Sequence, residues 1–202
     1  MIGAVYVVTD PDAALPVAEQ ARAAARGGAW AVQLRDKRAA DRDLARLAAA
    51  LLDELAPLGL RLFVNDRIEV ARATGADLHI GQGDGDPRAA RDRIAPDALL
   101  GLSIETVAQC PAIPEGVAYI GAGPVRATAT KPEAAAPVGF DGLARIAAVS
   151  PVPTLAIGGL TAADAAAVRR SGAAGMAVVS AVCRAPDPEA ATRALVKAWS
   201  LA

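Results

Sequence analysis

The chain has few aromatic residues, few cysteines and little net charge. Aromatic side chains make up only 3% of its 202 residues, and the formal net charge is −1. A nearly neutral chain has no general attraction for nucleic acid or for an anionic membrane surface. Its two cysteines, Cys110 and Cys183, are too few for a disulfide framework. We therefore expect ordinary reduced thiols and a cytoplasmic setting.

Long apolar runs are also missing, and we expect no signal peptide. No stretch approaches the roughly 18 apolar residues that suggest a membrane span. The first ten residues, MIGAVYVVTD, lack the basic start of a signal peptide and are typical of a strand. The composition is nevertheless 53% hydrophobic, which is enough for one sizeable core. We expect a single domain over residues 1–202.

Eight short apolar runs rich in β-branched residues recur along the chain. They cover residues 5–9, 30–34, 61–65, 77–80, 99–103, 118–122, 154–157 and 176–179. Segments of Ala, Leu and Arg with helical spacing separate them, and Thr161 with Asp164 has the spacing of a helix N-cap pair. Strands that alternate with helices are typical of a parallel sheet, and eight such units predict a compact (β/α)8 barrel.

A doubly wound open sheet is the main structural alternative. The turn that follows the first apolar run reads TDPDAAL. It lacks the Gly-x-Gly-x-x-Gly pattern that binds a dinucleotide in such sheets. The sequence therefore favours the closed barrel.

The predicted carboxyl ends of the strands hold residue types that this chain otherwise uses rarely. Only three of its 21 basic residues are lysines, and two of these, Lys37 in QLRDK and Lys131 in GPVRATATK, follow predicted strands. Arg35 and the only asparagine, Asn65, occupy equivalent places. Active sites of parallel barrels lie at this end. Three unpaired cations, Arg35, Lys37 and Lys131, directed at one cavity indicate an anion, most often phosphate.

Two carboxylates follow neighbouring strands at the same end. With a diphosphate nearby, Asp66 and Asp84 suggest Mg²⁺, which is commonly held by one or two carboxylates, phosphate oxygens and water. Asp86 is close enough to replace Asp84. A zinc site is not expected, because neither cysteine lies at a strand end. The only histidine, His79, lies inside a strand, so we expect a packed or supporting role and no pairing with Ser103 or Ser180 in a hydrolytic triad.

The last two predicted strands indicate a second anion site. Gly158 and Gly159 follow one strand, and Val179 with Ser180 ends the other. Glycines let backbone N–H groups approach a phosphate, and the loops after strands seven and eight commonly form the phosphate site of a barrel. Two anion sites in one barrel mouth predict two phosphorylated substrates or one large one.

Eight motifs occur in a fixed order between residues 6 and 182: YVVTD, QLRDK, VNDR, LHIGQGD, GLS, IGAGPVRATATK, AIGGL and AVVSAV. Together they resemble the thiamine-phosphate synthase family. The resemblance implies a (β/α)8 barrel, usually a homodimer, that requires Mg²⁺. It implies an enzyme that joins 4-amino-5-hydroxymethyl-2-methylpyrimidine diphosphate to 4-methyl-5-(2-phosphoethyl)thiazole, or to the carboxylated thiazole, giving thiamine phosphate and diphosphate.

The resemblance also implies a role for each motif residue. The pyrimidine diphosphate would contact Gln33, Leu34, Arg35, Asp36, Lys37, Asn65, Ser103 and Lys131. The thiazole phosphate would contact Thr128, Ala129, Thr130, Gly159, Val179 and Ser180. Asp66 and Asp84 would hold Mg²⁺. Catalysis would depend on Lys131, Arg35, Lys37 and Ser103, with the cations neutralising the charge of the departing diphosphate.

The chain departs from the family pattern in two places. Arg126 and Ala127 stand where the family often has an aromatic residue and a proline, and Ile104 with Glu105 stands where it often has a histidine. Arg126 would change the wall around the substrates or contact a phosphate. A thiazole tautomerase with a similar barrel and a non-catalytic sensor of phosphorylated ligands are the alternative functions. The intact charged set that includes Lys37 and Lys131 favours the synthase.

Overall fold

The computed structural model describes residues 2–128, 130 and 135–202. The strands in this part of the chain are β1 (Val5–Val8), β2 (Ala31–Leu34), β3 (Arg61–Asn65), β4 (Asp77–Ile80), β5 (Leu100–Ile104), β6 (Tyr119–Ala122), β7 (Thr154–Ile157) and β8 (Gly175–Val178). Each strand pairs in parallel with the next, and β8 pairs with β1, so the sheet closes into a barrel. The predicted (β/α)8 barrel is confirmed.

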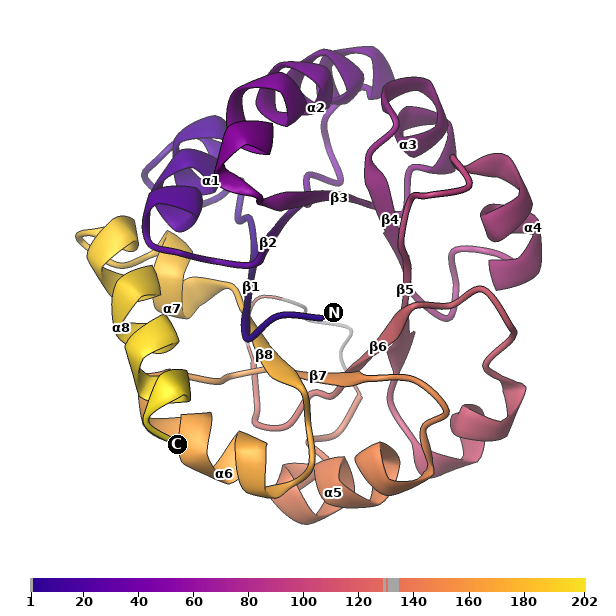
Figure 1. The fold of residues 1–202 in the computed structure, drawn as a ribbon, viewed down its shortest axis with the longest axis vertical. Helices are drawn as coiled ribbons and strands as arrows, with labels where there is room; N and C mark the ends of the chain where they lie inside the picture. The colour runs from indigo at the N-terminus through magenta and orange to yellow at the C-terminus, as the bar shows by residue number, and fades with distance from the viewer. Residues whose placement is uncertain (1, 129, 131–134) are drawn as a thin grey trace.

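Helices surround the barrel on the outside (Figure 1). They are α1 (Val17–Arg26), α2 (Asp41–Leu55), α3 (Ile68–Thr74), α4 (Pro87–Arg93), α5 (Gly139–Val149), α6 (Ala165–Arg170), α7 (Ser180–Cys183) and α8 (Pro188–Ser200). The described residues also form the 3₁₀ helices η1 (Ala56–Leu58), η2 (Val107–Ala112) and η3 (Ala162–Asp164).

One βα unit departs from the predicted alternation. Between β5 and β6 the connection contains only the 3₁₀ helix η2. Pro111 lies inside η2 and has no N–H to donate, so a longer α-helix is disfavoured there. The N-cap pair predicted at Thr161 and Asp164 is confirmed as a reciprocal capping box at the start of η3.

Alternating side chains divide the apolar core into two layers. Val5 and Val7 of β1 face outward and belong to the layer between the barrel and the helices, whereas Tyr6 faces inward. The inward cluster consists of Tyr6, Ala31, Phe63, Tyr119, Leu155 and Ala177. The ring of Tyr6 lies 5.1 Å from that of Phe63 and 5.9 Å from that of Tyr119. Large aromatic side chains therefore fill the barrel below its carboxyl end.

The amino end of the barrel is tied together by a buried carboxylate. Asp77, the first residue of β4, forms a two-pronged ion pair with Arg61, the first residue of β3, and also accepts a hydrogen bond from the Leu99 amide at 2.8 Å. Burial raises the pKa of Asp77, although Arg61 opposes this. Polar contacts at this end of a barrel contribute to stability and leave the opposite end for function.

The two cysteines are buried free thiols, as expected. Burial raises the pKa of the Cys183 thiol to about 12, so it is a poor nucleophile at neutral pH. Within the described ranges, no helix has both the length and the apolar character needed to cross a membrane.

Candidate active site

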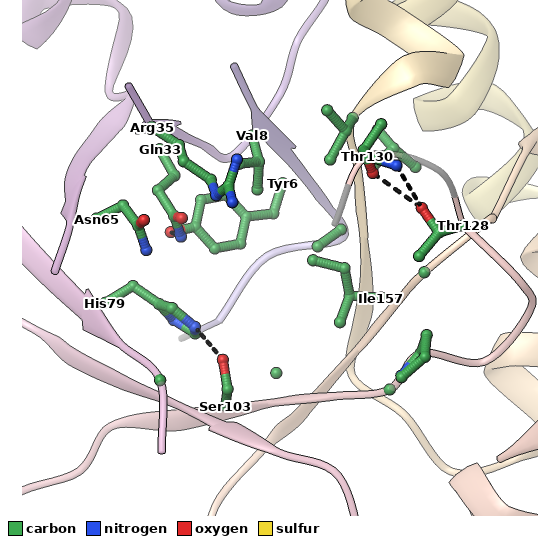
Figure 2. Close-up of a pocket in the computed structure, with 18 of the residues that line it drawn as sticks. Tyr6, Val8, Gln33, Arg35, Asn65, His79, Ser103, Thr128, Thr130 and Ile157 are labelled. Carbon is green, nitrogen blue, oxygen red and sulfur yellow. Dashed lines mark hydrogen bonds between the residues drawn. The ribbon is translucent and has the colours of Figure 1, made fainter. Parts of the chain in front are cut away.

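A cavity of about 380 Å³ opens at the carboxyl end of the barrel. All eight strands, or the loops that directly follow them, contribute to its wall. Tyr6 and Gln33 come from β1 and β2, and His79 and Ser103 come from β4 and β5. Figure 2 shows these side chains facing a common space, with Thr128 and Thr130 across from Asn65.

Most of the residues predicted for the two substrates and the metal line this one cavity. They are Gln33, Arg35, Lys37, Asn65, Asp84, Ser103, Thr128, Thr130, Gly159, Val179 and Ser180. Residues far apart in the sequence meet here because a closed barrel brings the carboxyl ends of all its strands to one rim. The structure thus brings these residues together, while their individual roles stay predictions.

Other predicted residues do not line the cavity within the described part of the chain. Leu34 follows Gln33 on β2, so its side chain points the other way and is fully buried in the outer layer. The Asp36 carboxylate accepts hydrogen bonds from the amides of Arg38 and Ala39 and shapes the loop after β2. Asp66 stands just outside the cavity wall. Ala129 and Lys131 lie outside the described residues.

The prediction of three unpaired cations is wrong for Lys37. Its ammonium group forms an ion pair with Asp66, and Arg67 contacts the other oxygen of that carboxylate at 3.1 Å. Asp66 directly follows β3, where its backbone has a φ of 55°. Arg35 differs from Lys37, because none of the ion pairs among the described residues involves it. Its guanidinium group is therefore a cation of the cavity wall without an ion-pair partner among the described residues.

Of the two predicted metal ligands, Asp66 has both oxygens paired with cations, whereas Asp84 keeps one oxygen available. Asp84 lines the cavity and uses one carboxylate oxygen to accept a hydrogen bond from the Gly81 amide at 2.7 Å. Its other oxygen has no hydrogen-bond partner among the described residues. Asp86, the alternative ligand, instead caps the start of α4 by accepting from the Arg88 amide. Hard carboxylate oxygens fit Mg²⁺. No cluster of three acidic, histidine or cysteine side chains suitable for a metal occurs in the described residues.

His79 contacts Ser103 in a supporting arrangement and not in a hydrolytic triad. Nε2 of His79 lies 3.0 Å from the Ser103 hydroxyl, and Nδ1 lies 2.9 Å from the Tyr119 hydroxyl (Figure 2). His79 stands opposite Gly101 in the β4–β5 pairing, so Ser103, two residues further on, projects to the same side. Because the partner of Nδ1 is a phenol, these contacts do not form the Ser-His-carboxylate arrangement of a hydrolase.

The opposite wall is formed by the loops after β6, β7 and β8. The hydroxyls of Thr128 and Thr130 lie 2.8 Å apart and face the cavity. Gly159 has a φ of 63°, and a Cβ atom there would lie 2.6 Å from the Ala127 carbonyl oxygen. Glycine is therefore needed for the close approach of the β6 and β7 loops as well as for the backbone conformation.

Sequence reasoning missed the aromatic floor of the cavity. Tyr6 and Tyr119, the only two tyrosines of the chain, both reach into it. Burial raises the pKa of both phenols, so both stay protonated. Strand alternation could have indicated that both tyrosines point into the barrel, because each stands one residue before an apolar residue that faces outward from its strand. Without the strand pairing, however, the sequence gives no sign that they touch.

The fold and the site together define a single-domain (β/α)8-barrel enzyme whose site is formed by the loops at the carboxyl end. A family model described as thiamine monophosphate synthase matches residues 5–182. The chain belongs to this family.

Similar proteins support the assignment over nearly the whole length. The thiamine-phosphate synthase of Solidesulfovibrio magneticus is 51% identical over 194 residues, covering 94% of this chain and 92% of its own. That of Roseiflexus sp. strain RS-1 is 47% identical over 197 residues, covering 96% and 84%. A solved thiamine phosphate pyrophosphorylase from Pyrococcus furiosus matches with a TM-score of 0.89 at 32% identity, covering 98% of this chain and 96% of its own.

Proposed function

We propose that the chain is a thiamine-phosphate synthase, a transferase of thiamine biosynthesis. It joins 4-amino-5-hydroxymethyl-2-methylpyrimidine diphosphate to 4-methyl-5-(2-phosphoethyl)thiazole, or to the carboxylated thiazole, and releases diphosphate. The observation that carries the proposal is the single cavity lined by residues of both predicted substrate sites. A reaction between two substrates requires that both sites open onto one space, because the reacting atoms must come within about 3.5 Å of each other.

The pyrimidine diphosphate occupies the side of the cavity formed by β2 to β5. Arg35 and Lys37 follow β2, and Asn65 ends β3, so two cations and an amide donor stand together for phosphate oxygens. Gln33 and Ser103 lie deeper, beside the tyrosines. We therefore propose that the diphosphate lies at the mouth and the pyrimidine ring toward the floor. Lys131 remains proposed as a further diphosphate contact, although it lies outside the described residues.

The thiazole phosphate occupies the side formed by the last three strands. Gly159, Val179 and Ser180 line the cavity after β7 and β8, which is the common phosphate position in such barrels. Thr128 and Thr130 stand on the neighbouring loop and face the same space. Ala129, between them, is also proposed to contact this substrate and lies outside the described residues.

Catalysis depends on charge more than on acid–base chemistry. The amino group of the pyrimidine pushes electrons toward the methylene carbon as the diphosphate leaves, and the thiazole nitrogen then attacks that carbon. Arg35 and Lys37 neutralise the charge that develops on the diphosphate. Asp66 and Asp84 would hold Mg²⁺, which supplies further charge neutralisation when bound. Their donor chemistry fits that ion, and phosphate oxygens would complete its coordination.

The test is product formation from both substrates. Purified protein should form thiamine phosphate when given the pyrimidine diphosphate, the thiazole phosphate and Mg²⁺. Omission of either substrate should abolish the product. Isomerisation of the carboxylated thiazole phosphate without formation of thiamine phosphate would overturn the proposal in favour of a tautomerase.

We also propose that the enzyme acts as a cytoplasmic homodimer. The two free cysteines are consistent with a reduced compartment. Light scattering coupled to gel filtration measures the mass in solution, which should be twice the 20.3 kDa of one chain. A mass equal to one chain would contradict the dimer.

A further inference from the structure

Five polar side chains form a continuous hydrogen-bonded chain across the cavity floor. Nε2 of Gln33 donates to the Tyr6 hydroxyl at 2.9 Å, and the Tyr119 hydroxyl donates to the Tyr6 hydroxyl at 3.1 Å. The Tyr119 hydroxyl also lies 2.9 Å from Nδ1 of His79, and Nε2 of His79 lies 3.0 Å from the Ser103 hydroxyl. The five residues come from β2, β1, β6, β4 and β5, so the chain connects opposite sides of the barrel.

The number of available hydrogens fixes the direction of this chain. A phenol has one hydrogen, and Tyr119 gives its hydrogen to Tyr6. The Tyr119 oxygen is therefore an acceptor for His79, and Nδ1 of His79 carries the hydrogen between them. In a neutral imidazole the other nitrogen is then an acceptor, so Nε2 receives the hydroxyl hydrogen of Ser103.

Both ends of the chain consequently present acceptors to the cavity. Ser103 spends its hydrogen on His79, which leaves the lone pairs of its oxygen for a ligand. Gln33 gives one of its two amide N–H hydrogens to Tyr6, which fixes the amide group, and its carbonyl oxygen remains for a ligand. Both residues line the cavity. A ligand group with two N–H donors fits this pair of oxygens, whereas a carbonyl or a ring nitrogen offers no hydrogen to either.

We propose that Tyr6, Tyr119 and His79 are positioning residues that hold the Gln33 and Ser103 oxygens as hydrogen-bond acceptors for the exocyclic amino group of the pyrimidine. This deepens the proposed function and rests on it. The amino group becomes more positive as it pushes electrons toward the departing diphosphate. Two fixed acceptors therefore bind it more tightly in the transition state than in the ground state, which raises kcat.

Gly101 makes the arrangement possible. A Cβ atom at this position on β5 would lie 2.2 Å from Cζ of Tyr119 and 2.6 Å from Nδ1 of His79. Atoms cannot approach that closely, so any side chain at this position would push Tyr119 or His79 away from the other. The glycine thus leaves the space through which the phenol reaches the imidazole.

The tautomer of His79 can be observed directly. Because His79 is the only histidine of the chain, its side-chain ¹⁵N signals in protein without a histidine tag are unambiguous. The expected spectrum is that of a neutral ring with hydrogen on Nδ1. Hydrogen on Nε2, or on both nitrogens, would overturn the proposal, because Ser103 would then accept from His79. This measurement depends neither on substrates nor on any variant.

A set of variants tests the consequence for catalysis. Tyr119→Phe keeps the ring but removes the hydroxyl that accepts from Nδ1. We expect kcat to fall about tenfold, the effect of one neutral hydrogen bond at the upper end of its range. The KM for the thiazole phosphate should not change. In a Ser103→Ala background, Tyr119→Phe should cost clearly less than in the wild type, since the path from Tyr119 through His79 ends at Ser103.

Thr154→Val is the matched control. It removes a buried hydroxyl that lies outside the hydrogen-bonded chain and has no partner among the described residues. Its kcat should equal that of the wild type. Two outcomes would overturn this proposal alone, provided that the wild type is active. One is a Tyr119→Phe variant with unchanged kcat, and the other is additive effects of Tyr119→Phe and Ser103→Ala. A wild-type protein that makes no thiamine phosphate would instead overturn the proposed function.

Discussion

At the scale of single residues, the basic side chains of the mouth are not equivalent. Lys37 is committed to Asp66 in the structure, whereas the Arg35 guanidinium forms no ion pair among the described residues. A cation already paired with a carboxylate contributes less net charge to a phosphate than an unpaired one. We therefore propose that the leaving diphosphate depends more on Arg35 and Lys131 than on Lys37. For Lys131 this rests on the sequence, which contains only three lysines.

Lys131→Ala should lower kcat more than it raises the KM for the pyrimidine diphosphate. The reason is that negative charge on the diphosphate grows during departure, so the lysine acts most strongly in the transition state. Loss of one charged contact corresponds to a fall of about 10²–10³ in kcat. Lys131→Arg should recover little, because a planar fork does not replace a compact ammonium group. Steady-state kinetics of both variants are the measurement, and a change in KM alone would contradict this role.

Thr154 offers a stability prediction at the same scale. The residue is 3% exposed, and its hydroxyl has no partner in the described residues. A buried hydroxyl without a hydrogen bond costs about 1–3 kcal/mol. Thr154→Val should therefore raise the free energy of unfolding by part of that amount, as measured by urea denaturation. A destabilised variant would show that the hydroxyl is satisfied in solution.

At the scale of secondary-structure elements, Arg126 ties two loops of the site together. Its guanidinium group contacts Asp164 of η3 at 2.7 Å and lies over the ring of Phe140 in α5 at 5.2 Å. Its backbone N–H donates to the Gly158 carbonyl at 3.0 Å. The side chain thus joins the loop that carries Thr128 to the loop that carries Gly159. This departure from the family pattern is an inter-loop tie, an arrangement that the sequence alone did not predict.

Arg126→Met should weaken this tie and do so in a pH-dependent way. Burial opposes ionisation of Asp164, but hydrogen bonds from Thr161 and Arg126 together hold the pKa of this carboxyl below its ordinary value. A lowered pKa stabilises the folded state above the ordinary value of about 4, and the stabilisation is lost as the pH falls through the lowered pKa. The difference in Tm between wild type and variant should therefore be present at pH 7 and shrink in acid.

A kinetic comparison separates the tie from general stability. Arg126→Met should also raise the KM for the thiazole phosphate, since the two loops are proposed to hold that substrate. Arg169→Met is the control, because Arg169 stacks on Trp199 at 5.8 Å and contacts its carbonyl oxygen away from the site. That variant should leave this KM unchanged. Equal effects of the two variants would show that Arg126 acts only through overall stability.

The elements themselves were largely predictable, for a physical reason. Strands buried on both faces form short β-branched runs, and all eight predicted runs correspond to observed strands with ends that differ by one residue at most. Helix η2 was harder to predict from the sequence, because the stretch that includes Pro111 has neither a clear helical period nor a strand pattern. The predicted strand ends also indicated which loop residues would lie together, because the carboxyl ends of all strands in a barrel lie at one rim.

At the scale of the whole molecule, the side-chain contacts between different strands could not be predicted from the sequence. His79 pairs with Ser103 and Tyr119 because β4, β5 and β6 are neighbours with a particular register. Lys37 reaches Asp66 for a similar reason, across the loops after β2 and β3. A single sequence carries no signal for register or for the reach of a long side chain. A predicted residue can therefore be right in location and wrong in pairing, as Lys37 shows.

The metal prediction belongs to this scale, because the described residues lack a cluster of three suitable side chains that would hold an ion unaided. Mg²⁺ should therefore bind together with diphosphate and only weakly without it. In thermal denaturation, Mg²⁺ alone should barely change Tm, and inorganic diphosphate with Mg²⁺ should raise it by more than the sum of the separate effects.

Asp84→Asn should remove this excess, because it replaces a carboxylate whose second oxygen is available for the ion. Asp86→Asn, at the cap of α4, is the control and should keep the excess. Purely additive shifts in the wild type would mean that the two ligands bind independently, and Asp84 would then have no part in holding a shared metal.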